Sequence, residues 1–174
     1  MTTAILDNTR ISKHLGQTSE YKDQYDPMLL VREPRSNNRT HLDIQDDDLP
    51  FVGFDIWNAY EVSGLTETGF PVAGIAKIVY PCDSKYIVES KSIKLYFNSF
   101  NMYKCGVDSS DVLSRIGHLA EKDLSALLET HVSVHIENAS GRANRDELFR
   151  GGRYHTLEDM VTLEEITGLK VDTY

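Results

Sequence analysis

Residues 88–96, Val-Glu-Ser-Lys-Ser-Ile-Lys-Leu-Tyr, bring together side chains that can recognise a small polar ligand. An ionised carboxylate such as that of Glu89 accepts hydrogen bonds through two oxygens, so it matches a ligand edge with two adjacent N–H donors. The N1–H and 2-amino groups of a guanine-like ring form such an edge. Ser90, Lys91 and Lys94 follow at the predicted start of a helix, with Ser90 as the expected cap. Free backbone N–H groups and the positive end of the helix dipole make a helix start a site for anions.

The placement of two lysines in the first helical turn supports this interpretation. Lys91 and Lys94 lie three residues apart and share one helix face, so they could meet one phosphate group together. Positive charge is normally unfavourable at the positive end of a helix dipole, and a local exception of this kind points to function. Spacing alone leaves a second interpretation open, in which an ordinary helix is capped and Glu89 pairs with the lysines.

Alternating apolar residues predict the strands that position this segment. Residues 55–63 and 71–80 read as two long strands, and the short glycine-bearing loop between them predicts an antiparallel hairpin. Residues 81–84 interrupt the second strand, which we interpret as a bulge. Extended, apolar residues 86–88 follow, so the carboxylate of Glu89 is expected at the end of a strand.

From Ser90 onward the apolar residues recur at helical spacing. One helix is predicted from Ser90, and Gly106 can end it. A second helix, capped by Ser109 or Ser110, is predicted to run to about Glu129.

The remainder of the chain completes an alternating pattern. Residues 131–136 read as a strand again, and a weaker strand is predicted after the polar residues 138–152. The order β-β-α-α-β-β predicts the α+β class, with an antiparallel sheet and two helices on one face. Residues 1–50, rich in proline and loop residues, are predicted as a loosely structured N-terminal extension, and residues 51–174 as one module. Open sheet edges favour pairing with another copy of the chain.

Composition excludes several classes of function. The 174 residues include 27 acidic and 18 basic side chains, a net charge of −9 that disfavours nucleic-acid binding. No run approaches the about 20 apolar residues of a membrane span, and the amino terminus has no secretory pattern. We therefore expect a cytoplasmic protein with neither membrane nor nucleic acid as a partner.

Other candidate catalytic residues are few. Cys82 and Cys105 are too far apart for a Cys-x-x-Cys metal site, and a free cysteine is by default an inert apolar residue. His131 and His135 lie four residues apart, on one face of the predicted strand; a surface strand is favoured over a zinc site. We assign no catalytic residue and no metal ligand.

The string Glu89-Ser90-Lys91-Ser92-x-Lys94-Leu95-Tyr96, followed by Asn98-Ser99-Phe100-Asn101, resembles the signature of the NADPH-dependent 7-cyano-7-deazaguanine reductases, the QueF nitrile reductases. Further strings resemble the amino-terminal module of the two-module form of that family: Tyr25-Asp26-Pro27, Leu29-Leu30, Pro34-Arg35-Ser36, Asn38-Arg39, Leu49-Pro50-Phe51, Gly53, Asp55-Ile56-Trp57 and Tyr60-Glu61. The similarity covers about residues 21–128.

The resemblance implies a fold, a substrate and a cofactor. The fold is a tunnelling fold (T-fold) module, which assembles with other modules, either as a homo-oligomer or by pairing with a second T-fold module. The reaction is reduction of the nitrile of 7-cyano-7-deazaguanine to 7-aminomethyl-7-deazaguanine, with NADPH, in queuosine biosynthesis for tRNA modification. Glu89 would hold the guanine-like edge, and Val88 and Ser90 would contact the same base. Ser90 and Lys91 would contact NADPH.

The chain departs from the family pattern in one respect. Family members need a nucleophilic cysteine that attacks the nitrile carbon to form a thioimide, and a nearby aspartate that donates a proton. In the two-module form both belong to a Cys-x-x-x-x-Gln-Pro-Asp-like string of the second module, and this sequence contains no such string. We therefore expect no reductase activity from the chain alone. The alternatives are a catalytically inactive deazapurine- or purine-binding T-fold protein and, less favoured, a pterin-pathway cyclohydrolase, which typically needs a cysteine and histidine zinc site.

Overall fold

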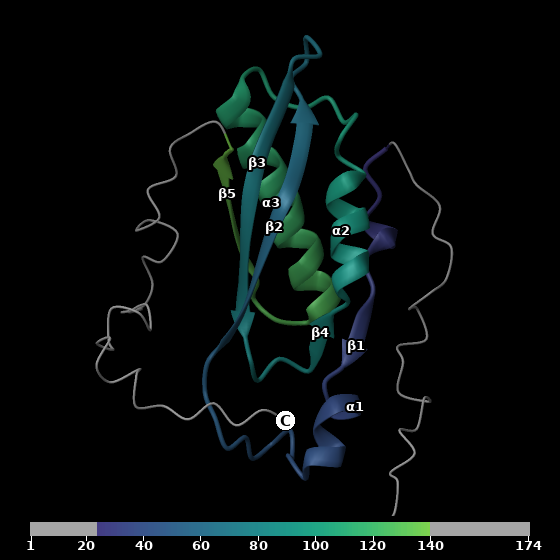
Figure 1. Ribbon diagram of the computed structural model, residues 1–174, viewed down its shortest axis with the longest axis vertical. Coiled ribbons are helices and arrows are strands. Elements are labelled where there is room, and N and C mark those ends of the chain that lie inside the picture. Colours follow the sequence, from purple (N-terminus) through teal and green to yellow (C-terminus); the bar gives the residue numbers. More distant parts are fainter. Residues whose placement is uncertain (1–23, 140–174) are drawn as a thin grey trace, which may run out of the picture.

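The computed structural model of the protein describes residues 24–139, which contain two antiparallel sheets (Figure 1). The larger sheet has three strands in the order β2 (Phe54–Leu65), β3 (Pro71–Pro81) and β5 (Ser133–Asn138). The smaller one pairs β1 (Arg32–Pro34) with β4 (Tyr86–Val88). The hairpin of the first two long strands is confirmed, with Leu65 opposite Pro71 at its tip.

Two longer helices cover the sheet. α2 (Ser90–Asn98) packs beside β2, and α3 (Ser109–Leu128) lies across β3 and β5 (Figure 1). The structure therefore confirms the α+β class with antiparallel sheets, whereas the tunnelling fold stays a prediction. The weaker strand predicted after residue 152 lies outside the described residues. No helix among residues 24–139 has both the length and the apolar character needed to cross a membrane.

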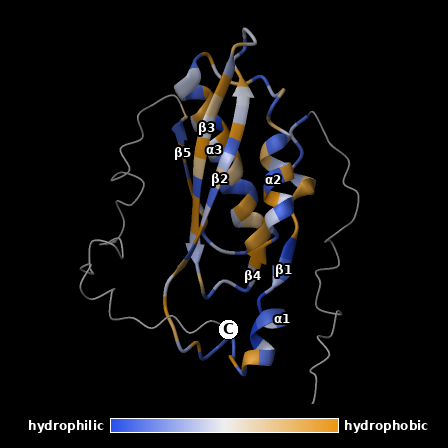
Figure 2. Ribbon diagram, in the orientation of Figure 1, coloured by the Kyte–Doolittle hydropathy of each residue, from blue (hydrophilic) through white to orange (hydrophobic). Residues whose placement is uncertain are grey.

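The core lies between the helices and the sheet. Alternate residues of β3 are buried, including Val72, Ala76, Ile78 and Tyr80, as a strand with one covered face requires. α3 buries one apolar stripe, which consists of Val112, Leu113, Ile116, Ala120, Leu124 and Leu128. In Figure 2, apolar and polar residues are interspersed along α3, whereas most of β3 is apolar or intermediate in hydropathy. Burial of this stripe holds α3 to the sheet and leaves its other face in water.

A β-bulge changes which residues of β2 face the core. The register with β3 shifts between Ala59 and Val62, so Tyr60 and Glu61 share the place of one residue. Strict alternation would put Val62 on the same face of the strand as Ile56 and Tyr60. Val62 is nevertheless 1% exposed, whereas Tyr60 is 71% exposed. The expected bulge at residues 81–84 is wrong, because those residues form a turn that carries the chain out of the larger sheet to β4.

α2 ends earlier than predicted, and α3 has a different cap, whereas its predicted end near Glu129 is confirmed. α2 ends at Asn98 rather than near Gly106, because the Ser99 hydroxyl donates to the Tyr96 carbonyl and tight turns follow, which keep a spacing of three residues without helix. The cap of α3 is neither predicted serine but Asp108, whose carboxylate accepts from the Asp111 N–H at 2.9 Å.

The described part of the predicted N-terminal extension, residues 24–50, contains short regular elements. They are β1, α1 (Ser36–Arg39) and the single 3-10 turns Pro27–Leu29 and Thr40–Leu42. Arg35 and Arg39 are buried, although arginine is rarely found inside a protein. The Arg35 guanidinium pairs with Asp55 and bonds Ser84, so it fastens this segment to the hairpin.

Candidate functional site

Glu89 lies at the junction of β4 and α2 and is the cap of the helix. Its carboxylate accepts the backbone N–H of Lys91 through Oε1 at 2.9 Å and that of Ser92 through Oε2 at 2.6 Å. The sequence predicted Ser90 for this position, and that prediction is wrong: Ser90 is the first residue inside the helix. A carboxylate at a helix start is favoured because its charge opposes the positive end of the dipole.

The two hydrogen bonds orient the Glu89 carboxylate but leave some of its lone pairs available for a ligand. Each carboxylate oxygen has two lone-pair sites, so one on each oxygen remains after the helix N–H groups are bound. Glu89 is half-buried, which leaves part of the group accessible. The arrangement therefore offers a ligand two adjacent acceptors in a fixed plane, the geometry that matches two parallel N–H donors.

The same hydrogen bonds correct the expected anion site. The backbone N–H groups of Lys91 and Ser92 were expected to be free for a phosphate, but both donate to Glu89. These two N–H groups are therefore not available to an anion near this helix start. Lys94 forms its ion pair with Glu61 rather than with Glu89.

The other predicted binding residues occupy three different environments. Val88 is 2% exposed and its side chain packs in the core, so a ligand would meet its backbone atoms rather than its side chain. Ser90 is exposed and Lys91 is half-buried, each in the first turn of α2. A hydroxyl, an ammonium group and the Glu89 carboxylate therefore lie within one helical turn.

Lys94 lies apart from this group. Its Nζ atom forms an ion pair of 3.1 Å with Glu61 of β2, at an open groove of about 330 Å³ between β2 and α2. Apolar side chains form much of this groove, among them Trp57 and Phe97, and Ser90 lies at its border. Lys94 is thus engaged by Glu61 of β2, and the phosphate site that the sequence predicted for Lys91 and Lys94 together stays a prediction.

The cysteines lie outside this junction. Cys105 is buried, and burial raises the pKa of its thiol, which disfavours the reactive thiolate. Cys82 is half-buried in the turn after β3, and its carbonyl accepts from Arg39 at 2.5 Å. Neither position provides the features of an activated nucleophile.

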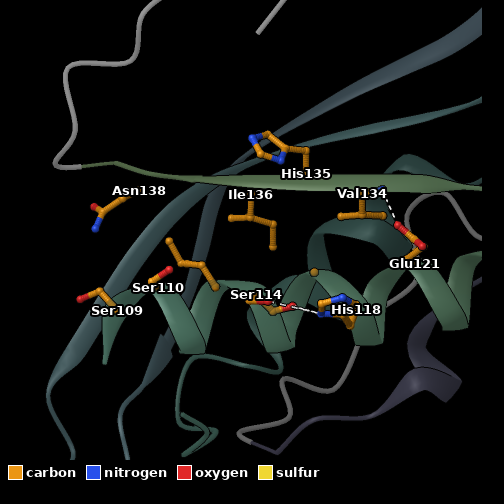
Figure 3. A pocket seen from close by; sticks show the side chains of 11 residues that line it. Ser109, Ser110, Ser114, His118, Glu121, Val134, His135, Ile136 and Asn138 are labelled. Atoms are coloured by element: carbon orange, nitrogen blue, oxygen red, sulfur yellow. Dashed lines mark hydrogen bonds between the residues drawn. The ribbon is translucent and has the colours of Figure 1, made fainter. Parts of the chain in front are cut away.

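A larger cavity, of about 540 Å³, lies between α3 and β5 (Figure 3). Its histidines do not converge: His118 lies on α3 with Nδ1 at 2.8 Å from the Ser114 carbonyl, whereas His135 projects from β5 away from α3. Glu121 accepts the Val134 N–H at 3.2 Å. Residues 24–139 contain no cluster of three potential metal ligands, and none of the predicted binding residues lines this cavity.

Sequence reasoning missed the role of Ser92. This residue is inside the recognised string, but its side chain is 3% exposed and is bonded to Val31, 61 residues earlier in the chain. No local pattern signals that contact, because the partner is a backbone group and therefore independent of residue type.

The chain is similar to known proteins over most of the residues that the structure describes. The family described as "Nitrile reductase, 7-cyano-7-deazaguanine-reductase N-term" matches residues 21–136. A protein of Rickettsia canadensis (strain McKiel) named NADPH-dependent 7-cyano-7-deazaguanine reductase is 52% identical over 120 residues, 69% of this chain and 41% of that relative. One of the same name from Rickettsia bellii (strain OSU 85-389) is 54% identical over 101 residues, 58% of this chain and 36% of the relative. The chain thus spans about two fifths of the length of the first of these.

Proposed function

The chain belongs to the family of the amino-terminal part of 7-cyano-7-deazaguanine reductases, and we propose that it is the ligand-gripping module of such a nitrile reductase. In this role it binds 7-cyano-7-deazaguanine and NADPH, so that the nitrile is reduced to the aminomethyl group on the route to queuosine. The support is the family match together with a helix start that carries an oriented acceptor, a hydroxyl and an ammonium group.

The observation that carries the proposal is the orientation of Glu89. Its two oxygens are each held by one helix N–H and each retain a lone pair. The N1–H and 2-amino group of a 7-deazaguanine are two parallel donors at the spacing of a carboxylate's oxygens. Val88 contributes backbone atoms beside the base, and Ser90 an exposed hydroxyl.

The first turn of α2 also offers side chains that suit the phosphates of NADPH. Bound NADPH would supply hydride, and this chain's residues would only bind and orient it. The Lys91 ammonium group attracts the dinucleotide's phosphates and the Ser90 hydroxyl donates a hydrogen bond to them. The backbone N–H groups of Lys91 and Ser92 are already used, so they do not take part in this contact.

The nucleophile and the proton donor come, in this proposal, from a second module. Burial of Cys105 and the absence of a Cys-x-x-x-x-Gln-Pro-Asp-like string in the sequence both support this division. The chain alone is then a binding module without reductase activity, and activity requires a partner that supplies the cysteine and the aspartate.

Titration of 7-cyano-7-deazaguanine into the purified chain tests the proposal. Glu89→Gln replaces one acceptor oxygen by a donor, and we expect the dissociation constant to rise at least about tenfold. Glu67→Gln is the matched control, because Glu67 is exposed in the turn between β2 and β3, and it should bind like the wild type. Thermal unfolding of both variants establishes that the fold is retained.

Two results separate the possibilities. Equal affinity of Glu89→Gln and the wild type contradicts the role of the carboxylate. Binding of the base that never leads to reduction, even after addition of the carboxy-terminal module of a relative, favours the catalytically inactive purine-binding protein instead.

A further inference from the structure

The backbone of Val31 crosses the junction that carries Glu89. The Glu89 N–H donates to the Val31 carbonyl at 2.9 Å, and the Val31 N–H donates to the Ser92 hydroxyl oxygen at 3.1 Å. The neighbouring pair Arg32 and Val88 continues this contact as the first rung between β1 and β4. Both polar groups of one residue's backbone are therefore used to fasten the start of α2.

Ser92 connects this fastening to the carboxylate. Its hydroxyl donates to the Glu89 carbonyl at 2.7 Å, while its own N–H donates to Glu89 Oε2 at 2.6 Å. The Ser92 side chain is 3% exposed, so water does not compete well for these bonds. One residue thus restrains both the main chain and the side chain of Glu89.

We propose that Ser92 is a positioning residue that sets the selectivity of Glu89 for ligands with two adjacent N–H donors. This inference rests on the proposed function, because it concerns the same base. A carboxylate that can rotate still attracts a single donor, but it loses the second of two parallel hydrogen bonds. The hydrogen bonds of Val31 and Ser92 therefore matter more for selectivity toward the 2-amino group than for the affinity of Glu89 for a single N–H donor.

Ser99, the cap at the other end of α2, provides a matched comparison. Its hydroxyl donates to the carbonyl three residues earlier, Tyr96, at 2.6 Å, and accepts an N–H from the N-terminal segment, that of Asp26, at 3.3 Å. It is fully buried. Ser99 thus repeats the bonding pattern of Ser92 at the opposite end of α2, away from Glu89, and its loss should cost stability without changing selectivity.

The test compares 7-cyano-7-deazaguanine with 7-cyano-7-deazahypoxanthine, which lacks the 2-amino group. We expect the wild type to prefer the first ligand, and Ser92→Ala to lower the ratio of the two dissociation constants about tenfold, the effect of about one hydrogen bond. Ser99→Ala should leave the ratio unchanged. A Ser92→Ala ratio equal to that of the wild type overturns the positioning role and leaves the proposed function intact.

A second measurement does not depend on a ligand. Hydrogen exchange of the Lys91 amide reports how firmly the Glu89 carboxylate is held, because that amide donates to Oε1. We expect faster exchange at Lys91 in Ser92→Ala but not in Ser99→Ala. Should the wild type show no preference between the ligands, the proposed function fails, and the exchange comparison alone then decides whether Ser92 positions Glu89.

Discussion

The hydroxyl group of Tyr25 donates a hydrogen bond of 2.6 Å to the carboxylate of Asp123, 98 residues later in the chain. The hydroxyl of Tyr96 donates to the same oxygen at 2.8 Å. The Tyr25 ring also packs against Phe100, with 4.7 Å between ring centroids. This cluster joins the segment that precedes β1 to both α2 and α3. It therefore helps to hold Val31, in the same segment, where it bonds Glu89 and Ser92.

Tyr25→Phe should lower the free energy of unfolding by about 1–2 kcal/mol, because it removes one hydrogen bond to a charged acceptor and keeps the ring contacts. Urea denaturation measures the difference. Tyr60→Phe is the control: Tyr60 is 71% exposed, and its variant should change the free energy by less than about 0.5 kcal/mol. Similar losses in the two variants would show that the Tyr25–Asp123 bond contributes no stability.

Alkaline pH should destabilise the protein through the same cluster. Burial, followed by the hydrogen bond to Asp123 and its charge, raises the pKa of Tyr25 and of Tyr96 above the ordinary value. The unfolded chain ionises its tyrosines near pH 10, about their ordinary pKa, whereas the folded chain keeps these protons. Stability is therefore full below about pH 10 and is lost as the pH rises above it.

Urea denaturation at a series of pH values from about 8 to about 11 tests this dependence. The double variant Tyr25→Phe with Tyr96→Phe should show a shallower decline than the wild type. An unchanged decline would place the responsible groups elsewhere.

Two glycines should respond in opposite ways to alanine. A Cβ atom at Gly74 of β3 would lie 2.8 Å from the Glu137 carbonyl oxygen and 2.7 Å from Ile136, so Gly74→Ala should cost about 1–3 kcal/mol by overpacking. At Gly117 of α3 the nearest atom would be 3.7 Å away, an ordinary contact. Gly117→Ala should stabilise by up to about 1 kcal/mol, because alanine favours helix. Thermal unfolding of both variants measures these changes in stability. A loss of stability in both variants would contradict the packing around Gly117.

Lys91→Ala should weaken NADPH binding about tenfold and leave binding of the base nearly unchanged, because the ammonium group is expected to meet phosphate rather than the ring. Fluorescence titration with each ligand measures both effects. Lys122→Ala, on the exposed face of α3, is the charge-matched control. Equal weakening of both ligands by Lys91→Ala would contradict the proposed division between Glu89 and Lys91.

Local patterns in the sequence were sufficient for the main elements and for the helix start at which the candidate site is proposed. The hairpin of β2 and β3 follows from alternating residues and a glycine-bearing loop, and the buried stripe of α3 follows from helical spacing. The string from Glu89 to Lys91 marked the helix start that the structure shows. These features depend on residues that are close in the sequence, so the spacing of their apolar side chains can be read from the sequence itself.

The tertiary structure alone decided the features that depend on distant partners. The bulge that turns Val62 inward is a shift in the register between β2 and β3, and no sequence pattern between Ala59 and Val62 predicts it. Glu89 rather than Ser90 caps α2, and the Ser92 hydroxyl accepts from the backbone N–H of Val31, a group that almost every residue carries, 61 residues earlier. Such contacts are set by the packing of whole elements, because a backbone N–H or carbonyl has no signature in the sequence until its neighbour in space is known.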